Sequence, residues 1–144
     1  MSENDVVSSI GSGCMTLSLT RAIAPMGHVY TFEYNSTRAE QSRQEFTKYR
    51  NQHATDIILK HPRRLGIGHL VTVTCQDVCS KKAGSASGFV GVPDSYVDAV
   101  FLDLPEPWLA IEDAFRVLKV GKKICCYSPC IEQASLYLPR ACLL

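Results

Sequence analysis

The sequence predicts an α/β fold in which helices cover a mostly parallel β-sheet. Short runs of β-branched residues alternate with longer amphipathic segments along its 144 residues, as in strands that are joined through helices. A glycine turn at residues 11–13 opens the first helical segment, and the apolar run after this helix ends in an acid, Glu33. Both features are typical of the ligand-binding edge of such sheets. The length suits one domain with a sizeable core.

The first half of the chain contains two strand–helix units. Residues 6–7 could be the end of a first strand, and residues 14–24 form a helix that Pro25 stops. The apolar run 28–33 predicts a buried strand, and an amphipathic helix over residues 37–49 follows it. The inward faces are expected to carry Met15, Leu19, Ala22 and Ile23 on the first helix, and Ala39, Phe46 and Tyr49 on the second.

Two further strands come after a basic segment. Residues 51–68 have no clear placement, and within them the basic loop 60–64 could be an insertion. The short apolar runs 70–74 and 97–102 predict strands, and an aspartate follows each of them. Residues 80–93 between these strands are rich in Gly, Ser and Lys, which indicates a loop.

The C-terminal part supplies one more helix and one more strand. Residues 108–118 predict a helix that ends at Gly121, and residues 123–127 predict the strand. No clear pattern continues beyond this point, so we expect a core over residues 1–133 and an atypical tail over residues 134–144. The helix is expected to turn Trp108, Ile111, Phe115 and Leu118 inward.

Composition and cysteine spacing exclude several classes of protein. Hydrophobic residues make up 46% and the net charge is +1, which fits a soluble globular protein without an overall basic field. RNA binding would therefore depend on local patches or on a partner subunit. No apolar run approaches the roughly 20 residues of a membrane span, and no secretory signal is present, so we expect a protein of the cytosol or nucleus. The seven cysteines contain no Cys-x-x-Cys pair, which favours small thiols over a zinc or disulfide site.

The glycine turn and Glu33 together indicate a nucleoside cofactor. Gly11, Ser12 and Gly13 let backbone N–H groups approach a ligand beside a helix N-terminus. A dinucleotide fingerprint would need a glycine where Thr16 stands, and no P-loop lysine follows. Glu33 comes twenty residues after Gly13, where a carboxylate can accept both ribose hydroxyls. This combination favours adenosylmethionine over NAD.

Two aspartates after strands are candidates for binding and catalysis. Asp77 could bind an adenine edge, or it could cap the turn that follows; both interpretations fit the local sequence. Asp103 ends a buried strand, where open α/β sheets have their active sites, and Pro105 and Pro107 stiffen the loop behind it. A structural cap for the helix at Trp108 is the alternative for Asp103, and the two intervening prolines make it the weaker one.

Five sequence blocks carry a resemblance to a known family. They cover residues 11–19, 30–40, 71–79, 99–108 and 128–133, and the last two contain Asp-Leu-Pro-Glu-Pro-Trp and Ser-Pro-Cys-Ile-Glu-Gln. From Gly11 to Gln133 the chain resembles the catalytic subunits of the tRNA (adenine-58-N1)-methyltransferases. The last two blocks make the match specific, because they are not general methyltransferase features. The match is to the nuclear, eukaryotic form.

The resemblance implies a Rossmann-like class I methyltransferase core, incomplete within these 144 residues, which binds S-adenosyl-L-methionine and no metal. It implies a nuclear enzyme that methylates N1 of adenine 58 in the T-loop of tRNA, in a heterotetramer with a non-catalytic partner subunit. It also implies roles for individual residues: Gly11, Ser12, Gly13 and Cys14 at the methionine moiety, Glu33 at the ribose, Arg38 in the cofactor pocket, Asp77 and Val78 at the adenine, and Asp103 at cofactor and substrate base as the catalytic residue. By itself Arg38 would be a solvated helix charge.

The chain departs from the family pattern at the glycine turn. Val7 stands where the pattern has an acid, Ser9 replaces its first glycine, and Ile10 is a bulky residue between small ones. These departures suggest a second hypothesis, a non-catalytic truncated fragment or isoform that keeps the fold and acts at most in subunit assembly. A third hypothesis is an NAD-dependent reductase, whose cofactor domain has the same strand–helix–strand arrangement.

Overall fold

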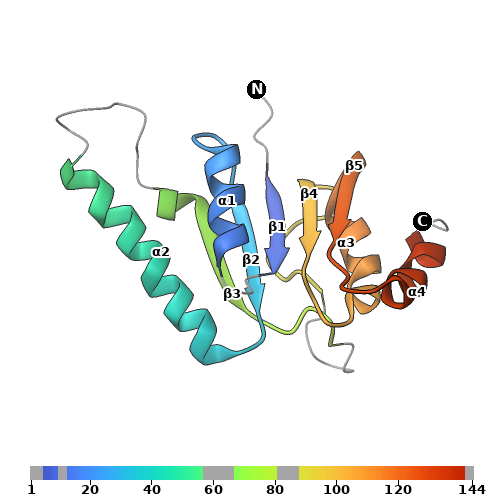
Figure 1. Ribbon diagram of the computed structural model, residues 1–144. Helices are drawn as coiled ribbons and strands as arrows, with labels where there is room; N and C mark the ends of the chain where they lie inside the picture. Colours follow the sequence, from blue (N-terminus) through green and yellow to red (C-terminus); the bar gives the residue numbers. More distant parts are fainter. Residues whose placement is uncertain (1–4, 10–12, 57–66, 81–87, 142–144) are drawn as a thin grey trace.

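The computed structural model describes residues 5–9, 13–56, 67–80 and 88–141. Five parallel strands form one sheet in the order β3-β2-β1-β4-β5 (Figure 1). This arrangement confirms the predicted α/β class with a parallel sheet. The strands are β1 (Val6–Ser9), β2 (Val29–Glu33), β3 (Val71–Cys75), β4 (Val97–Leu102) and β5 (Leu118–Cys126).

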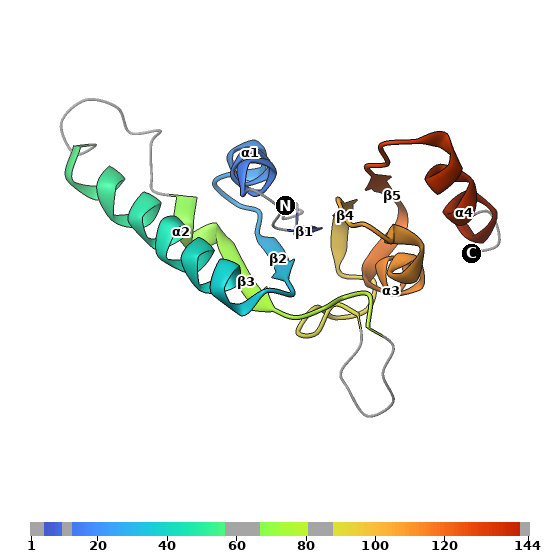
Figure 2. The ribbon, with the colours of Figure 1, turned by 60° about the horizontal axis from the view of Figure 1, so that its bottom comes forward.

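Helices cover both faces of this sheet. The helix α1 (Cys14–Ile23) packs on β1 and β2, whereas α3 (Ile111–Val117) packs on β5, and Figure 2 shows these two helices on opposite sides. The long helix α2 (Ser36–Asp56) lies against β2 and β3 at one end of the sheet. Three further elements complete the described fold: the 3-10 turns η1 (Ile67–Leu70) and η2 (Pro107–Leu109), and the helix α4 (Ile131–Ala141), which packs on η2 and α3.

The core lies mainly between the central strands and α3. Val7, Val100 and Leu102 from β1 and β4 are almost fully buried in it. Phe89 joins them at 1% exposure, and its ring meets Phe32 edge to face at a centroid distance of 5.3 Å. Strands β2, β3 and β4 lie within one residue of their predicted bounds, and residues 88–93 form a loop as predicted. The composition of that loop gave no sign that it anchors an aromatic side chain in the core.

Two threonines form the inward face of α1, and the prediction of an apolar face there is wrong. Thr16 and Thr20 are fully buried, while Met15 is 41% exposed. The Thr16 hydroxyl lies 3.4 Å from Ser8 Oγ and 3.5 Å from Thr31 Oγ1, so helix and sheet meet through a chain of hydroxyls. Polar groups can be buried in this way because they hydrogen-bond one another.

The connection from α3 to β5 also differs from the prediction. The helix is only Ile111–Val117, since Trp108 lies in η2 and Leu118 already pairs with Val97 as the first residue of β5. Gly121 therefore does not end a helix; it lies inside β5 at φ 78°, where the register against β4 shifts. Ile111 is buried as expected, but its inward companions are Ala114 and Val117, whereas Trp108 and Phe115 are half-buried.

Two more segments are helical beyond their predicted bounds. The α2 helix continues to Asp56 and buries Ala39 and Phe46 as expected, while the side chain of Tyr49 and the basic loop 60–64 lie outside the described residues. α4 runs across residue 133 into the segment expected to be an atypical tail. Its contacts with η2 and α3 are tertiary, so the local sequence pattern did not reveal it. In the described part of the chain, no helix is both long and apolar enough to cross a membrane.

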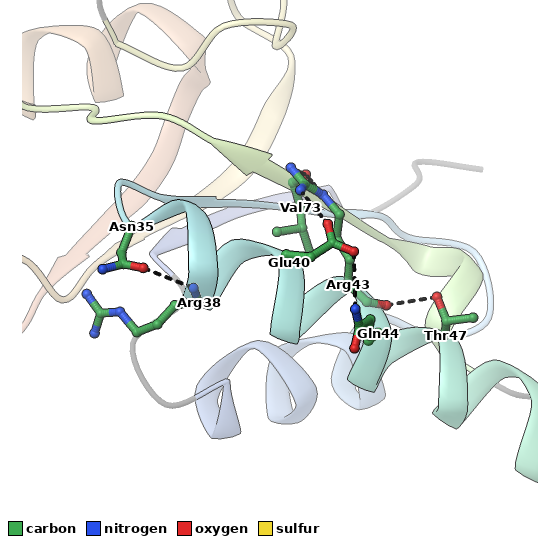
Figure 3. A network of polar contacts seen from close by, with 7 residues as sticks. All are labelled: Asn35, Arg38, Glu40, Arg43, Gln44, Thr47 and Val73. Atoms are coloured by element: carbon green, nitrogen blue, oxygen red, sulfur yellow. Dashed lines mark hydrogen bonds and ion pairs between the residues drawn. The ribbon is translucent and has the colours of Figure 1, made fainter.

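The edge strand β3 is held by an arginine of α2, as Figure 3 shows. Arg43 donates from Nε and Nη2 to the backbone oxygen of Val73, at 3.2 and 3.1 Å, and Glu40 accepts from its Nη1 at 3.2 Å. A carbonyl at the outer edge of a sheet lacks a strand partner, so this guanidinium satisfies it. At the start of the same helix, Asn35 Oδ1 accepts from the Arg38 amide at 3.0 Å and caps α2.

A carboxylate at the amino edge of the sheet ties three strand ends together. Asp98 accepts from Lys119 Nζ at 2.7 Å, from Lys122 Nζ at 2.9 Å and from the Asp5 amide at 3.3 Å. Burial opposes ionisation of Asp98, but these hydrogen bonds outweigh it and lower the pKa of the carboxyl.

We predict that Gly88→Ala destabilises the protein more than Gly91→Ala. Both glycines have positive φ, 74° and 86°, but a Cβ on Gly88 would lie 2.4 Å from Asp113 Cγ, whereas one on Gly91 meets nothing within 4 Å. The clash should cost about 1–3 kcal/mol beyond the shared backbone strain. Urea unfolding of both variants measures this difference; equal losses would contradict the crowding at Gly88.

We predict that the stabilisation from Asp98 disappears in acid. The native pKa lies below the unfolded value of about 3.9, so the ionised carboxylate stabilises the fold above that pH, and the effect is lost as the pH falls through the native pKa. The difference in unfolding free energy between wild type and Asp98→Asn should therefore shrink between about pH 7 and about pH 2. Glu45→Gln, which removes an exposed carboxylate on α2, is the control. A constant Asp98→Asn deficit across this range would rule the linkage out.

Candidate cofactor site at the carboxyl edge of the sheet

The parallel pairing of the strands places most of the predicted site residues at one edge. Gly13 and Cys14 follow β1, Glu33 ends β2, Asp77 follows β3 and Asp103 follows β4. Neighbouring strand ends are also joined directly, since the Gln76 amide donates to the Glu33 backbone oxygen at 2.8 Å. This edge includes the point between β1 and β4 where the strand order reverses, the usual ligand site of open α/β sheets. Gly11 and Ser12 lie outside the described residues.

The first turn of α1 offers backbone donors to a ligand. Gly13 precedes the helix in the left-handed conformation, with φ 79°, and no side chain caps this end. The first intrahelical bond runs from Leu17 N–H to Gly13 O, so the N–H groups before Leu17 have no partner within the helix. No acidic residue occupies the first turn, and Cys14 is exposed. Such an end can bind the carboxylate of a ligand through its N–H groups and the helix dipole.

Two donors hold one carboxylate oxygen of Glu33, and no described residue bonds to the other. Its side chain is 4% exposed, and Oε1 accepts from the Asn35 amide at 2.9 Å and from Arg38 Nη2 at 3.1 Å. Among the described residues, none bonds to Oε2. A buried carboxylate held in this way is fixed in orientation before a ligand arrives, and Oε2 remains available to hydroxyl donors.

Arg38 belongs to the site through Glu33. Its guanidinium ion-pairs with this carboxylate and lies over the Tyr34 ring, 5.3 Å from the centroid. The alternative, a fully solvated helix charge, is wrong even though the side chain is 47% exposed. Asn35 and Tyr34 were not among the predicted site residues. An Asn immediately before a helix is a recognised N-cap signal, and it could have drawn attention to Asn35.

Asp77 and Val78 have structural contacts of their own. Asp77 is exposed, and its Oδ1 accepts from the Cys79 amide at 3.0 Å, which is the turn-capping contact that the sequence left open. Val78 is 5% exposed and belongs to the hydrophobic core. The Val78 side chain is therefore held inside the fold, and the backbone of this turn is the part that lies at the edge.

Asp103 is exposed, and its carboxylate has no bond to any described residue. It does not cap the following helix: neither η2 nor α3 has a side-chain cap, and their N-cap residues are Glu106 and Ala110. The backbone of Asp103 is fixed instead by Ser9, whose hydroxyl accepts from the Asp103 amide at 3.1 Å and donates to the Asp103 oxygen at 3.0 Å. In the sequence, Ser9 stands out only as a departure from a glycine pattern.

Two cysteine thiols near the site are held protonated. Burial raises the pKa of Cys79 to about 11, with further contributions from Asp77 and Glu106, and burial with nearby Cys125 raises the pKa of Cys126 to about 11. Both thiols are therefore poor nucleophiles at neutral pH. In the part of the chain that the structure describes, no group of three or more His, Cys, Asp or Glu residues could hold a metal ion.

Comparison with known proteins gives a consistent set of relatives. Residues 4–138 match the family model described as tRNA methyltransferase complex GCD14 subunit. The chain is 39% identical over 129 residues to the tRNA (adenine(58)-N(1))-methyltransferase catalytic subunit of Dictyostelium discoideum, covering 89% of this chain and 35% of that protein. It is 36% identical over 125 residues to the corresponding subunit of Schizosaccharomyces pombe, covering 85% and 29%. The chain thus spans about a third of the length of these relatives.

Solved structures share the fold. A SAM-dependent O-methyltransferase from Thermotoga maritima superposes with a TM-score of 0.74 at 25% identity, covering 99% of this chain and 44% of that one. The tRNA (m1A58) methyltransferase from Aquifex aeolicus gives 0.67 at 22% identity, covering 95% and 44%. The Rossmann-like class I methyltransferase fold that the sequence predicts is therefore confirmed.

We predict that Cys79 and Cys126 react with iodoacetamide at least about tenfold more slowly at about pH 8 than two exposed cysteines, Cys75 and Cys125. Only the thiolate reacts, and a raised pKa leaves little thiolate at this pH. Their rates should keep rising well above pH 9, where an ordinary thiol levels off. Peptide mass spectrometry after timed alkylation measures each site. Equal rates at these four cysteines would show that burial does not control these thiols.

Proposed function

The chain belongs to the GCD14 family of tRNA methyltransferase complex subunits, and from this we propose that it is the cofactor-binding core of a catalytic subunit that methylates N1 of adenine 58 in tRNA. One observation carries the proposal beyond ancestry. The Glu33 carboxylate is buried and oriented by Arg38 at the end of β2, and it lies at the same sheet edge as the uncapped start of α1. The whole enzyme's activity is a proposal here because the chain spans about a third of its relatives.

The residues at this edge fit S-adenosyl-L-methionine. This molecule has a carboxylate, which suits the N–H groups after Gly13 at the start of α1. The resemblance assigns the methionine moiety to Gly11, Ser12, Gly13 and Cys14. It also has a ribose diol, which suits the available Oε2 of Glu33. Arg38 acts by holding Glu33, and the backbone at Asp77 and Val78 would face the adenine. NAD fits less well, because Thr16 is buried against the sheet where a dinucleotide fingerprint has a glycine.

Asp103 would act on the substrate base. When bound, S-adenosylmethionine supplies an electrophilic methyl group, which adenine N1 attacks with its lone pair while the bond to sulfur breaks and leaves its electrons on sulfur. No strong base is needed for this step, so the task of Asp103 is orientation. Its exposed carboxylate accepts a hydrogen bond from the exocyclic amine and stabilises the positive charge that grows on the ring. Because N1 is on the Watson–Crick edge, the base enters the site only after it leaves the folded tRNA loop.

We also propose a non-catalytic partner subunit in a heterotetramer, and a nuclear location. The family description names a complex, which supports a partner. The net charge of +1 supports it as well, because a chain without an overall basic field needs local patches or a second subunit to hold a polyanion such as tRNA. The nuclear location is supported by the resemblance to the eukaryotic form.

The test is thermal stabilisation by S-adenosylmethionine. Ligand at about 100 times its dissociation constant should stabilise the chain by about 2.7 kcal/mol, and NAD at the same concentration should not. Glu33→Gln should weaken binding about tenfold or more, because hydrogen bonds to a carboxylate are stronger than those to an amide. Glu45→Gln, an exposed carboxylate on α2, is the matched control and should bind like wild type.

The outcomes separate the hypotheses. No shift with either ligand would refute a competent cofactor site and favour a fragment that keeps the fold without activity. Stabilisation by NAD alone would favour a reductase. Equal loss in Glu33→Gln and Glu45→Gln would show that Glu33 does not hold the ribose.

A further inference from the structure

The last residue of β1 makes an unusual pair of hydrogen bonds. Ser9 is 8% exposed, and its hydroxyl contacts both polar groups of one distant residue: it accepts from the Asp103 N–H at 3.1 Å and donates to the Asp103 oxygen at 3.0 Å. The two residues are 94 positions apart in the chain. The contact therefore joins the end of β1 to the residue just beyond the end of β4.

Asp103 needs this contact because the regular strand pairing stops before it. The pairing between β1 and β4 runs up to Ser8 and Phe101, and on the other side β4 pairs with β5 up to Leu102 and Cys126. The Tyr127 amide still donates to the Leu102 oxygen at 2.9 Å. Asp103 is the first residue past both pairings, and the Ser9 side chain supplies the hydrogen bonds to its backbone that a neighbouring strand would otherwise provide.

A hydroxyl that binds both the N–H and the C=O of one residue restrains both of its backbone dihedral angles. The direction of the Cα–Cβ bond is then fixed as well, and with it the place from which the carboxylate starts. This matters at Asp103 because no described residue holds its carboxylate. The backbone restraint is the means by which the described part of the protein can aim this side chain.

We propose that Ser9 is a positioning residue that aims the Asp103 carboxylate at the substrate base; the claim rests on the proposed function, in which Asp103 faces that base. A glycine, which the family pattern has at this position, cannot form either bond because it has no side chain. The serine is thus a replacement with a function of its own. Through this serine, β1, which leads into the cofactor side of the site, also helps to orient Asp103 on the substrate side.

The neighbouring serine provides a matched control. Ser8 is on the same strand and is 1% exposed, but its hydroxyl contacts Thr16 on α1 at 3.4 Å and its neighbour's backbone oxygen at 3.2 Å. Ser8→Ala therefore removes a buried hydroxyl from β1 without touching Asp103. A loss that comes only from a missing buried hydroxyl should appear in both alanine variants.

The first measurement does not depend on the activity. Amide hydrogen exchange of Asp103, followed by NMR in the 144-residue chain and compared with the Val100 amide of β4, reports whether the Ser9 hydroxyl holds it. Ser9→Ala should speed exchange at Asp103 about tenfold relative to Val100, and Ser9→Thr, which keeps the hydroxyl, should restore it. Ser8→Ala should leave this ratio unchanged. An unchanged ratio in Ser9→Ala overturns the proposal.

The second measurement is methyl transfer to tRNA. Ser9→Ala should lower kcat about tenfold and change KM for S-adenosylmethionine less than about twofold, because the misaligned group is on the substrate side. Ser9→Thr should recover kcat, and Ser8→Ala should keep it. Faster exchange at Asp103 with an unchanged kcat overturns the positioning role. If the wild-type chain transfers no methyl group even when assembled with the proposed partner subunit, the proposed function is refuted, while the exchange data still decide whether Ser9 holds Asp103.

Discussion

β1 and β4 lie side by side at the centre of the sheet. The other strands that precede β4 in the chain lie on one side of this pair, and the strand that follows it lies on the other. From β1 the chain builds outward through β2 to β3, then returns to β4 and builds the other way to β5 (Figure 1). Because β1 and β4 pair in parallel, the two halves share one carboxyl edge. If β4 ran antiparallel to β1, Glu33 and Asp103 would lie at opposite edges of the sheet, about one strand length apart. The rest of the site follows from this pairing.

Hydroxyl groups tie β1 to its neighbours on the helix and in the sheet. Ser8 faces α1 and joins the buried chain with Thr16 and Thr31, whereas Ser9 faces β4 and holds the Asp103 backbone. Each such bond contributes only about 1 kcal/mol net, but a partner left alone in a buried place costs about 1–3 kcal/mol. These contacts therefore act more as constraints on which arrangement can form than as a large source of stability. An apolar residue in place of Thr16 would remove the hydroxyl that Ser8 and Thr31 contact.

The sequence predicts the local features of this molecule and misses those that depend on distant partners. Glu33 and Asp103 could be found because a strand that ends in an acid is visible within a few residues. The Thr16 face of α1 could not, because it depends on hydroxyls from two different strands. The end of α3 was misplaced for a similar reason: Leu118 is a better helix former than Val117, yet its pairing with Val97 makes it a strand residue. The contact of Ser9 spans 94 residues, and no local pattern announces it.

The two acids of the site differ in what holds them, and this difference separates their tasks. Glu33 is buried, and Arg38 and Asn35 fix one oxygen before any ligand arrives. Such a group would cost little reorganisation on binding a cofactor, which suits the proposed role of Glu33 at the ribose. Asp103 is exposed, and only its backbone is fixed among the described contacts. In the proposed function, this carboxylate would acquire its partner from the base, so discrimination there would depend on whether the incoming base carries a donor at the right place. The proposed site thus combines a carboxylate that is fixed beforehand, Glu33, with one that a bound base would complete, Asp103.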